Sequence, residues 1–288
     1  MKAFAKFLPR TVLVSLFAFG GTVIAVQAQP VDDSVIAAQR AALAAAASGR
    51  SFGPQAPRDI DNTAGSNPIN FTDAPDRAQM NLCTIYFTKG AEHRGGAFTT
   101  YAGNGDGRGN GTGYLYDGTL SAEETAPTGF SIGFGDANAT LKPGDTIEAH
   151  YVHTTTDVTP GPGIERCFGG SNEAPRLRIE AQVYVVVNDA NADDFEKLTE
   201  VRLVNDKHQA VNIPFFTGTP VVYDGSLSGP RFNQLPSPRR VTWSVRPEVM
   251  KISARSIANW LADNPFDERG ARGVRNLVTN EALLSPIE

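Results

Sequence analysis

The sequence predicts a mainly β protein: a single domain built on a twisted sheet or a sandwich, with short helices at its periphery. From about residue 80 onward, apolar and polar residues alternate in one segment after another, which is the period of a strand with one buried face. Stretches rich in Gly and Pro separate these segments. No repeat of fixed length is present, which argues against a propeller or a solenoid.

Residues 1–28 predict a signal peptide. Lys2, Lys6 and Arg10 precede an apolar stretch, and small residues stand at Val26 and Ala28, where a signal peptidase would cleave. A membrane anchor is the alternative, but the apolar stretch is short and contains two adjacent glycines. We therefore expect cleavage after Ala28 and a periplasmic or secreted protein.

The charge of the mature chain bears on its partners. The full sequence has 26 basic and 31 acidic residues, and three of the basic residues lie in the predicted signal peptide, which leaves 23 against 31 and a net charge of −8. An acidic protein is a poor partner for nucleic acid or for an anionic membrane surface. We expect neither as a partner of the mature protein. The sequence does not indicate the oligomeric state.

The chain divides into three parts. After the signal peptide, residues 29–75 begin with an alanine-rich helix over 31–48 and continue as a lead-in rich in Pro and Gly. Because the apolar face of this helix is mostly alanine, we expect it to dock loosely. Residues 76–288 form the β domain. Its predicted strands are 82–88, 145–155, 176–189, 199–204, 219–223 and 239–245, and its predicted short helices are 191–198 and 252–262.

Cys83 and Cys167 are the two cysteines of the chain. In an exported protein, two cysteines are most simply explained as one disulfide bond. A pair of thiolate metal ligands would need partners at close spacing, such as C-x-x-C, and the sequence has none. We therefore predict a Cys83–Cys167 disulfide.

Polar residues share one face on two of the predicted strands. In "LCTIYFT" Thr84, Tyr86 and Thr88 lie on one side, with Cys83, Ile85 and Phe87 on the other. In "DTIEAHYVH" Glu148 and His150 lie on one side and His153 on the other, so the two histidines cannot bind a common ion from a regular strand.

Glu92 and His93 follow the first of these strands in a turn. A carboxylate beside a histidine can fix the tautomer of a metal-binding imidazole. Glu92 and Glu148 are therefore candidate catalytic-site residues acting as partners of metal ligands, and His93 and His150 are candidate metal ligands.

The glycine-rich segment 103–111 lacks the chemistry of an ion or phosphate loop. An EF-hand would need a bidentate Glu where this chain has Leu115, and a phosphate-binding loop would need Gly-Lys-Ser/Thr. The segment is interpreted as a tight turn region that uses glycine for positive φ.

Several blocks of the sequence, in one order, resemble the delta-class carbonic anhydrases and their bacterial relatives. They are "NLC" running into "AEHRGGAFTTYAGNGDGRGNGTGY", then "GDTIEAHYVHTT", "RIEAQVYVVVND", "TGTPVVY", "VTWSVRP" and "GVRNLVTN". The resemblance covers about residues 50–285. It implies a zinc cofactor, with CO2 and bicarbonate as substrate and product. In carbonic anhydrases three neutral imidazoles hold the zinc and leave a fourth position for a water whose pKa falls to about 7.

The same resemblance locates an exception. The family pattern has His-x-His after "NLC", then "AEH", then an "IEVH"-like strand. Glu92, His93, Glu148 and His150 match this pattern, but Tyr86 and Thr88 occupy the two positions of the His-x-His pair. Neutral tyrosine and threonine hydroxyls are poor zinc ligands.

Three hypotheses follow from this exception. The first is a family member with a lost or altered metal site that is not an active enzyme. The second is an active carbonic anhydrase with a non-standard metal site built on His93 and His150, with Glu92, Glu148 or Tyr86. The third is a module that binds an anion or another small molecule in the vacated pocket, with Tyr86 and Thr88 as hydrogen-bond donors.

Overall fold

The structure is a computed structural model, and it describes residues 29–169, 174–227 and 231–288. The predicted signal peptide therefore lies outside the described residues. Within those three ranges, no helix combines the length and the apolar character that a membrane span requires.

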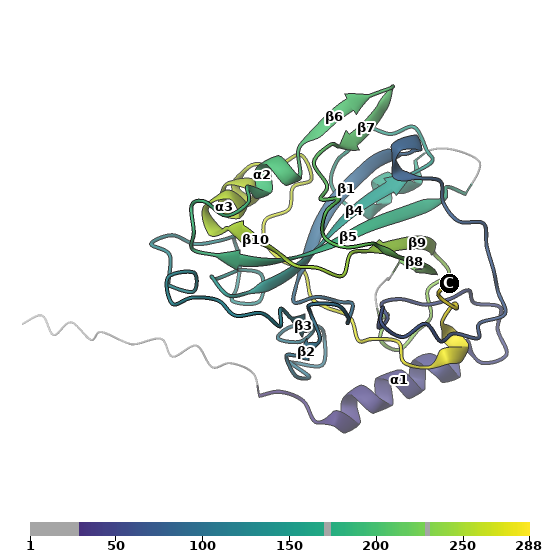
Figure 1. The fold of residues 1–288 in the computed structure, drawn as a ribbon. Helices are drawn as coiled ribbons and strands as arrows, with labels where there is room; N and C mark the ends of the chain where they lie inside the picture. The colour runs from purple at the N-terminus through teal and green to yellow at the C-terminus, as the bar shows by residue number, and fades with distance from the viewer. Residues whose placement is uncertain (1–28, 170–173, 228–230) are drawn as a thin grey trace, which may run out of the picture.

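A mixed sheet of six strands forms the body of the molecule (Figure 1). The strands are β1 (Asn81–Lys89), β4 (Thr146–Thr154), β5 (Leu177–Val187), β8 (Val221–Ser226), β9 (Arg240–Val245) and β10 (Met250–Ser253). Their order is β1-β4-β5-β9-β8, and β10 pairs with the C-terminal part of β5. The pairs β1–β4, β4–β5 and β8–β9 are antiparallel, whereas β5 pairs in parallel with both β9 and β10. The predicted mainly β fold is confirmed.

Two small hairpins and several short helices surround this sheet. The hairpins pair β2 (Thr100–Tyr101) with β3 (Tyr114–Leu115), and β6 (Val201–Val204) with β7 (Lys207–Ala210). The helices are α1 (Asp33–Ala47), α2 (Phe195–Leu198) and α3 (Ala254–Ala262), with 3-10 turns at Arg77–Gln79, Ile164–Phe168 and Glu281–Leu283. Each predicted strand and helix is present. Strands β2, β3, β7 and β10 were not predicted, because each is too short for an alternating pattern to stand out.

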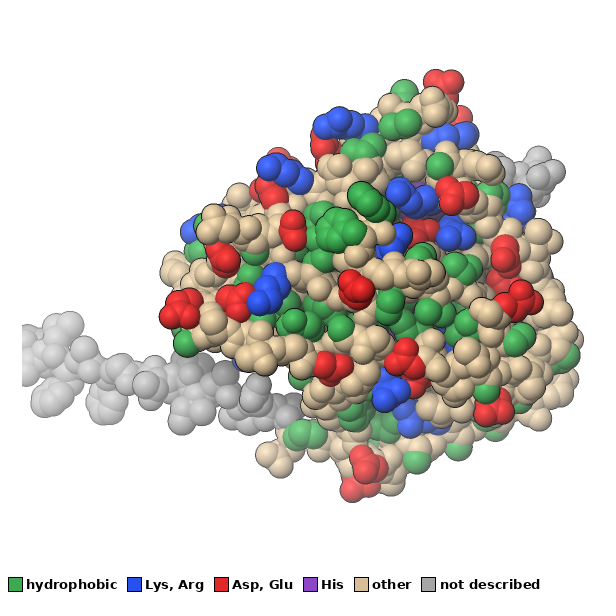
Figure 2. Space-filling model, viewed as in Figure 1, with side chains coloured by type: hydrophobic (Ala, Val, Ile, Leu, Met, Phe, Trp, Pro, Cys, Tyr) green, Lys and Arg blue, Asp and Glu red, His purple; other side chains and the backbone are tan. Residues whose placement is uncertain are grey.

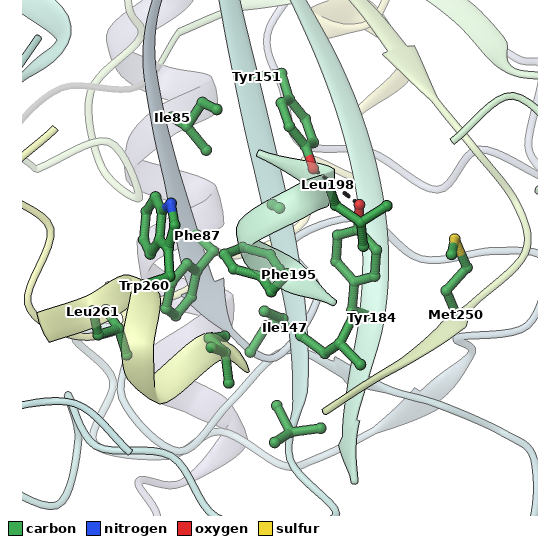
Figure 3. Close-up of a cluster of buried hydrophobic side chains, with 14 of the residues drawn as sticks. Ile85, Phe87, Ile147, Tyr151, Tyr184, Phe195, Leu198, Met250, Trp260 and Leu261 are labelled. Atoms are coloured by element: carbon green, nitrogen blue, oxygen red, sulfur yellow. Dashed lines mark hydrogen bonds between the residues drawn. The ribbon is translucent and has the colours of Figure 1, made fainter. Parts of the chain in front are cut away.

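The sheet is covered on both faces, so β1 and β4 are buried along almost their whole length. On one face Phe87 of β1 and Tyr184 of β5 pack against Phe195 of α2 and Trp260 of α3 (Figure 3). The Tyr151 and Tyr184 hydroxyls hydrogen-bond to each other within this cluster, at 3.0 Å. The opposite face carries the polar side chains of the candidate site.

Helix α1 is attached more firmly than its alanine content suggested. Its Leu43 and Ala47 are buried against Phe232 and Val278. The loop at 103–111 holds the other end of the helix, since the Asn104 side chain donates to the Val31 carbonyl and to the Asp33 carboxylate. The expectation of a loosely docked helix is therefore wrong. The buried side chains of Ile36 and Leu43 and the loop contacts outweigh the small alanine side chains.

The Cys83–Cys167 disulfide is present in the structure and joins β1 to the 3-10 turn Ile164–Phe168. One detail differs from the prediction. The pairing of β1 with β4 shifts between Leu82 and Thr84, so Cys83 is an extra residue in a bulge. Cys83 consequently packs on the face of the sheet that carries the candidate site, in one hydrophobic cluster with Val152. Ile85 and Phe87 belong to the cluster on the opposite face.

Candidate functional site

The site begins with four side chains on neighbouring strands. Tyr86 of β1 lies directly opposite His150 of β4, and Thr88 lies opposite Glu148. All four are buried. Side chains directly opposite each other on an antiparallel pair point to the same face. The sequence predicted that Tyr86 shares a strand face with Thr88 and that Glu148 shares one with His150, and the register now places the two pairs together.

Glu148 is the centre of a buried hydrogen-bond network. Its Oε1 accepts from His93 Nδ1 at 2.6 Å and from His150 Nε2 at 2.9 Å. Its Oε2 accepts from the backbone N–H groups of Glu92 and His93, at 2.7 and 3.0 Å. Burial alone would raise the pKa of this carboxyl group, but His93 and His150 together hold its pKa well below the ordinary value. Glu148 is therefore ionised and acts only as an acceptor.

The turn after β1 brings Glu92 and His93 back to Glu148. Gly90 has a φ of +94°, a conformation that glycine adopts without a steric penalty. Its N–H donates to the Thr146 carbonyl at 2.7 Å, and the Ala91 N–H donates to the Tyr114 carbonyl at 2.8 Å. This reversal presents two consecutive N–H groups to one carboxylate oxygen.

His93 uses both ring nitrogens within the protein. Since Nδ1 donates its proton to Glu148, Nε2 is an acceptor, and it receives the Tyr223 hydroxyl at 2.7 Å. The ring also contacts Trp243, with 4.9 Å between ring centroids. Burial holds the pKa of Tyr223 well above its ordinary value, so the phenol keeps the proton that it donates. His93 consequently has no ring nitrogen left for a metal.

His150 differs from His93 in one respect. Its Nε2–H donates to Glu148, which leaves Nδ1 as the unprotonated nitrogen. This Nδ1 is buried and has no hydrogen-bond partner among the described residues. The ring is held edge-on against Tyr86 and Trp243, at centroid distances of 4.8 and 5.3 Å. A fixed tautomer with a free lone pair is the arrangement that a metal-binding histidine requires.

The Tyr86 and Thr88 hydroxyls near His150 are poor metal ligands. Burial raises the pKa of Tyr86 far above the physiological range, so its phenol is protonated. The Thr88 hydroxyl donates to the Gly90 carbonyl at 2.8 Å. Burial also raises the pKa of Glu92, whose Oε2 lies 4.0 Å from His150 Nε2.

A small cavity of about 80 Å³ opens beside these side chains and is bordered by Tyr86, Thr88 and Glu92. Arg272 and Arg275 also line it. The Arg272 guanidinium stacks over the Tyr86 ring at 4.3 Å, and the Arg275 backbone N–H donates to Glu92 Oε1 at 3.2 Å. The cavity is large enough for one or two water molecules or a small ion.

Sequence reasoning did not single out Tyr223, Trp243, Arg272 and Arg275. Tyr223, Trp243 and Arg275 lie in three of the blocks that carry the family resemblance, "TGTPVVY", "VTWSVRP" and "GVRNLVTN", and Arg272 directly precedes the last of them. Those blocks supported the family, but no local pattern in them indicated a role.

The remaining histidines are remote from the site. His153 is buried on the opposite face of the sheet, and His208 lies on the β6–β7 hairpin. No histidine is visible on the face in Figure 2.

Comparison with known proteins identifies the family. The model of the delta carbonic anhydrase family matches residues 77–256, a segment that contains β1, β4, β5, β8 and β9. The match thus defines a carbonic-anhydrase-like protein. Because the match spans more than half of the 288 residues, the chain belongs to the delta carbonic anhydrase family.

Solved structures of carbonic anhydrases are also similar, at low identity. One is a hyperthermostable carbonic anhydrase from an active hydrothermal vent chimney, with 15% identity over 79% of this chain and 85% of that chain, and a TM-score of 0.29. The Photobacterium profundum alpha-carbonic anhydrase has 14% identity over 86% and 96%, with a TM-score of 0.28. A halotolerant carbonic anhydrase from Dunaliella salina has 13% identity over 79% and 86%, with a TM-score of 0.30. No curated protein matches the chain.

The donor set can be tested against the zinc site that the family implies. Three neutral imidazoles would be needed, and of the two histidines in the site, His93 and His150, only His150 has a ring nitrogen without a hydrogen-bond partner. Among the described residues there is no group of three or more His, Cys, Asp or Glu side chains placed to hold a metal ion. The residues present therefore do not fit a three-imidazole zinc site.

Proposed function

We propose that this protein is a carbonic-anhydrase-like protein that does not catalyse zinc-dependent CO2 hydration. The observation that carries the proposal is the state of His93, Tyr86 and His150. His93 is saturated by Glu148 and Tyr223, Tyr86 is a neutral phenol, and only the His150 Nδ1 lone pair is free. A single imidazole nitrogen is far below the ligand count of a catalytic zinc site.

The alternative of an active enzyme with a non-standard site on His93 and His150 would require His93 to release a partner. Releasing Tyr223 would leave a buried hydroxyl unpaired, and releasing Glu148 would remove the charge-assisted bond at 2.6 Å. Both changes are costly, which favours the non-catalytic function.

We also propose that the protein is exported to the periplasm or secreted. The support for this comes from the basic and apolar pattern of residues 1–28 and from the disulfide, a bond that persists in oxidising compartments. Mass determination of the mature protein tests the proposal, because cleavage after Ala28 predicts a chain that begins at Gln29.

The proposed loss of catalysis is tested on the purified mature protein by its zinc content and its CO2-hydration rate. We expect less than a tenth of a zinc ion per chain and no hydration above the uncatalysed rate. Stoichiometric zinc together with hydration activity would overturn the proposal.

A gain-of-binding variant tests the geometry of the same site. In Tyr86→His/Thr88→His two imidazoles share the face of His150 and Glu148, and the His150 Nδ1 lone pair supplies the third nitrogen. We expect this variant to bind one zinc ion per chain, measured by competition with a chromophoric chelator. The matched control, Arg202→His/Val204→His, places the same His-x-His spacing on β6 without the network, and we expect much weaker binding. Adding His150→Ala to the site variant is expected to abolish tight binding.

A further inference from the structure

A second and larger cavity adjoins the site on its outer side. Its volume is about 440 Å³, and it shares Arg272, Gly273 and Arg275 with the small cavity next to Tyr86. Helix α1 contributes Gln39 to its wall. The rest of the wall comes from the 107–108 turn and from residues 231–234, so four separate segments of the chain meet there.

The lining of this cavity is strongly basic. Arg108, Arg231, Arg272 and Arg275 all border it, and the wall residues drawn from the described chain include no Asp or Glu. The mature protein as a whole has a net charge of −8. The guanidinium groups attract an anion to this cavity, and the Glu268 carboxylate, which is not part of the wall, offsets part of the Arg272 charge.

Two of the four arginines are held in place by the protein. The Arg272 guanidinium donates to the Glu268 carboxylate and stacks over Tyr86. Arg275 lies over the Phe232 ring at 5.4 Å. Because these guanidiniums are already ordered, little further conformational entropy is lost when they bind an oxyanion.

The other two arginines are exposed at the rim of the cavity. The backbone of Arg108 is fixed by its N–H bond to Asp106 Oδ1 at 2.8 Å. Asn233 accepts the Asn276 N–H with its side-chain oxygen at 3.0 Å, so its amide NH2 remains as an uncharged donor on the wall. The cavity therefore presents hydrogen-bond donors from several directions, while Phe232 and Val274 supply apolar surface.

We propose that this cavity binds a small organic oxyanion with more than one negative charge, a polycarboxylate or a phosphorylated compound. Guanidinium groups bind carboxylate and phosphate oxygens through paired N–H bonds, and a cavity of this volume accommodates a small metabolite rather than a single inorganic ion. The ligand-binding wall does not include Tyr86, Thr88 or His150, so the inference holds whether or not the neighbouring site has lost its metal.

Calorimetric titration of the mature protein with citrate and with pyrophosphate, at low and at high salt, tests the proposal. We expect saturable one-to-one binding of at least one of the two probes, weakened by salt. Binding of citrate alone identifies a carboxylate ligand, and binding of pyrophosphate alone identifies a phosphate ligand. No saturable binding of either probe would overturn the proposal.

A pair of matched variants locates the binding. Arg108→Gln/Arg231→Gln removes the two exposed guanidiniums, and we expect the affinity to fall by about tenfold for each guanidinium removed. Arg50→Gln/Arg202→Gln makes the same change in net charge at exposed positions outside the cavity and should leave the affinity unchanged. Equal weakening in both variants would show non-specific attraction and refute the assignment. Zinc content, measured separately, is not expected to change in either variant.

Discussion

At the scale of single residues, the site depends on the acceptor capacity of Glu148. Two imidazole N–H groups and two backbone N–H groups converge on its two oxygens, so the carboxylate fixes the tautomers of both His93 and His150. The two histidines then differ only in the second ring nitrogen. The second nitrogen of His93 accepts from Tyr223, whereas that of His150 stays unpaired.

His153 provides a pH test of a buried histidine away from the site. Burial lowers its pKa from 6.5 to about 4, so the folded protein holds this imidazole neutral while the unfolded chain protonates it near pH 6.5. Between these values the unfolded state binds more protons, and stability therefore falls as the pH decreases from 6.5 toward 4. Integrated from pH 7.5 to 5.0, this loss is about 2 kcal/mol.

Urea unfolding of the natural protein and of His153→Gln at pH 7.5 and 5.0 measures this contribution. We expect the natural protein to lose about 2 kcal/mol more than the variant on acidification. Glu92 and Glu148 are common to both proteins, so their titration cancels in the comparison. Equal pH dependence in the two proteins would contradict a neutral, buried His153.

At the scale of elements, the register between β1 and β4 decides which side chains meet. A shift of one residue would exchange the faces of Tyr86 and Phe87 and would place either Phe87 or Lys89 opposite Glu148. The bulge at Cys83 lies just before the site residues of β1 and turns Cys83 toward Cys167 without altering the pairs that follow.

Helix α1 is an element whose contribution can be measured. Leu43 is 4% exposed and packs against the body of the protein, so Leu43→Ala leaves a cavity and is expected to lower the free energy of unfolding by about 2–4 kcal/mol. The matched control is Leu203→Ala on the β6–β7 hairpin, where the side chain is 64% exposed and the change is expected to stay within about 0.5 kcal/mol. Chemical denaturation of both variants provides the measurement. Equal effects would mean that α1 docks only loosely in solution.

At the scale of the whole molecule, the disulfide closes a loop of 84 residues that contains β2, β3 and β4. In the chain-entropy model a loop of this length stabilises the folded state by about 4–5 kcal/mol. We expect Cys83→Ala/Cys167→Ala to lose a free energy of this order in denaturant unfolding without reductant. Adding a reductant should destabilise the natural protein but not the variant. A natural protein that is insensitive to reductant would contradict this contribution.

Much of the fold could be predicted from the sequence because strand alternation is a local property. The spacing of Tyr86, Thr88, Glu148 and His150 alone predicts their shared faces, and the register agrees. The alternation rule failed at Cys83, where a bulge inserts one residue and is not visible in the apolar pattern. The sequence also underestimated how firmly α1 docks. Helix docking depends on the complementary surface formed by Phe232 and Val278, which the helix sequence alone does not show.

The sequence by itself determined most of the strand faces, the cysteine pair and the residue types at the two positions where the family resemblance led us to expect His-x-His. These follow from local backbone geometry and from side-chain chemistry. Only the tertiary structure decided that His93 is saturated by Tyr223, that His150 retains a free nitrogen, and that four arginines border one cavity. The physical reason is that these contacts join segments far apart in the chain, and their positions depend on how the whole sheet and its loops pack.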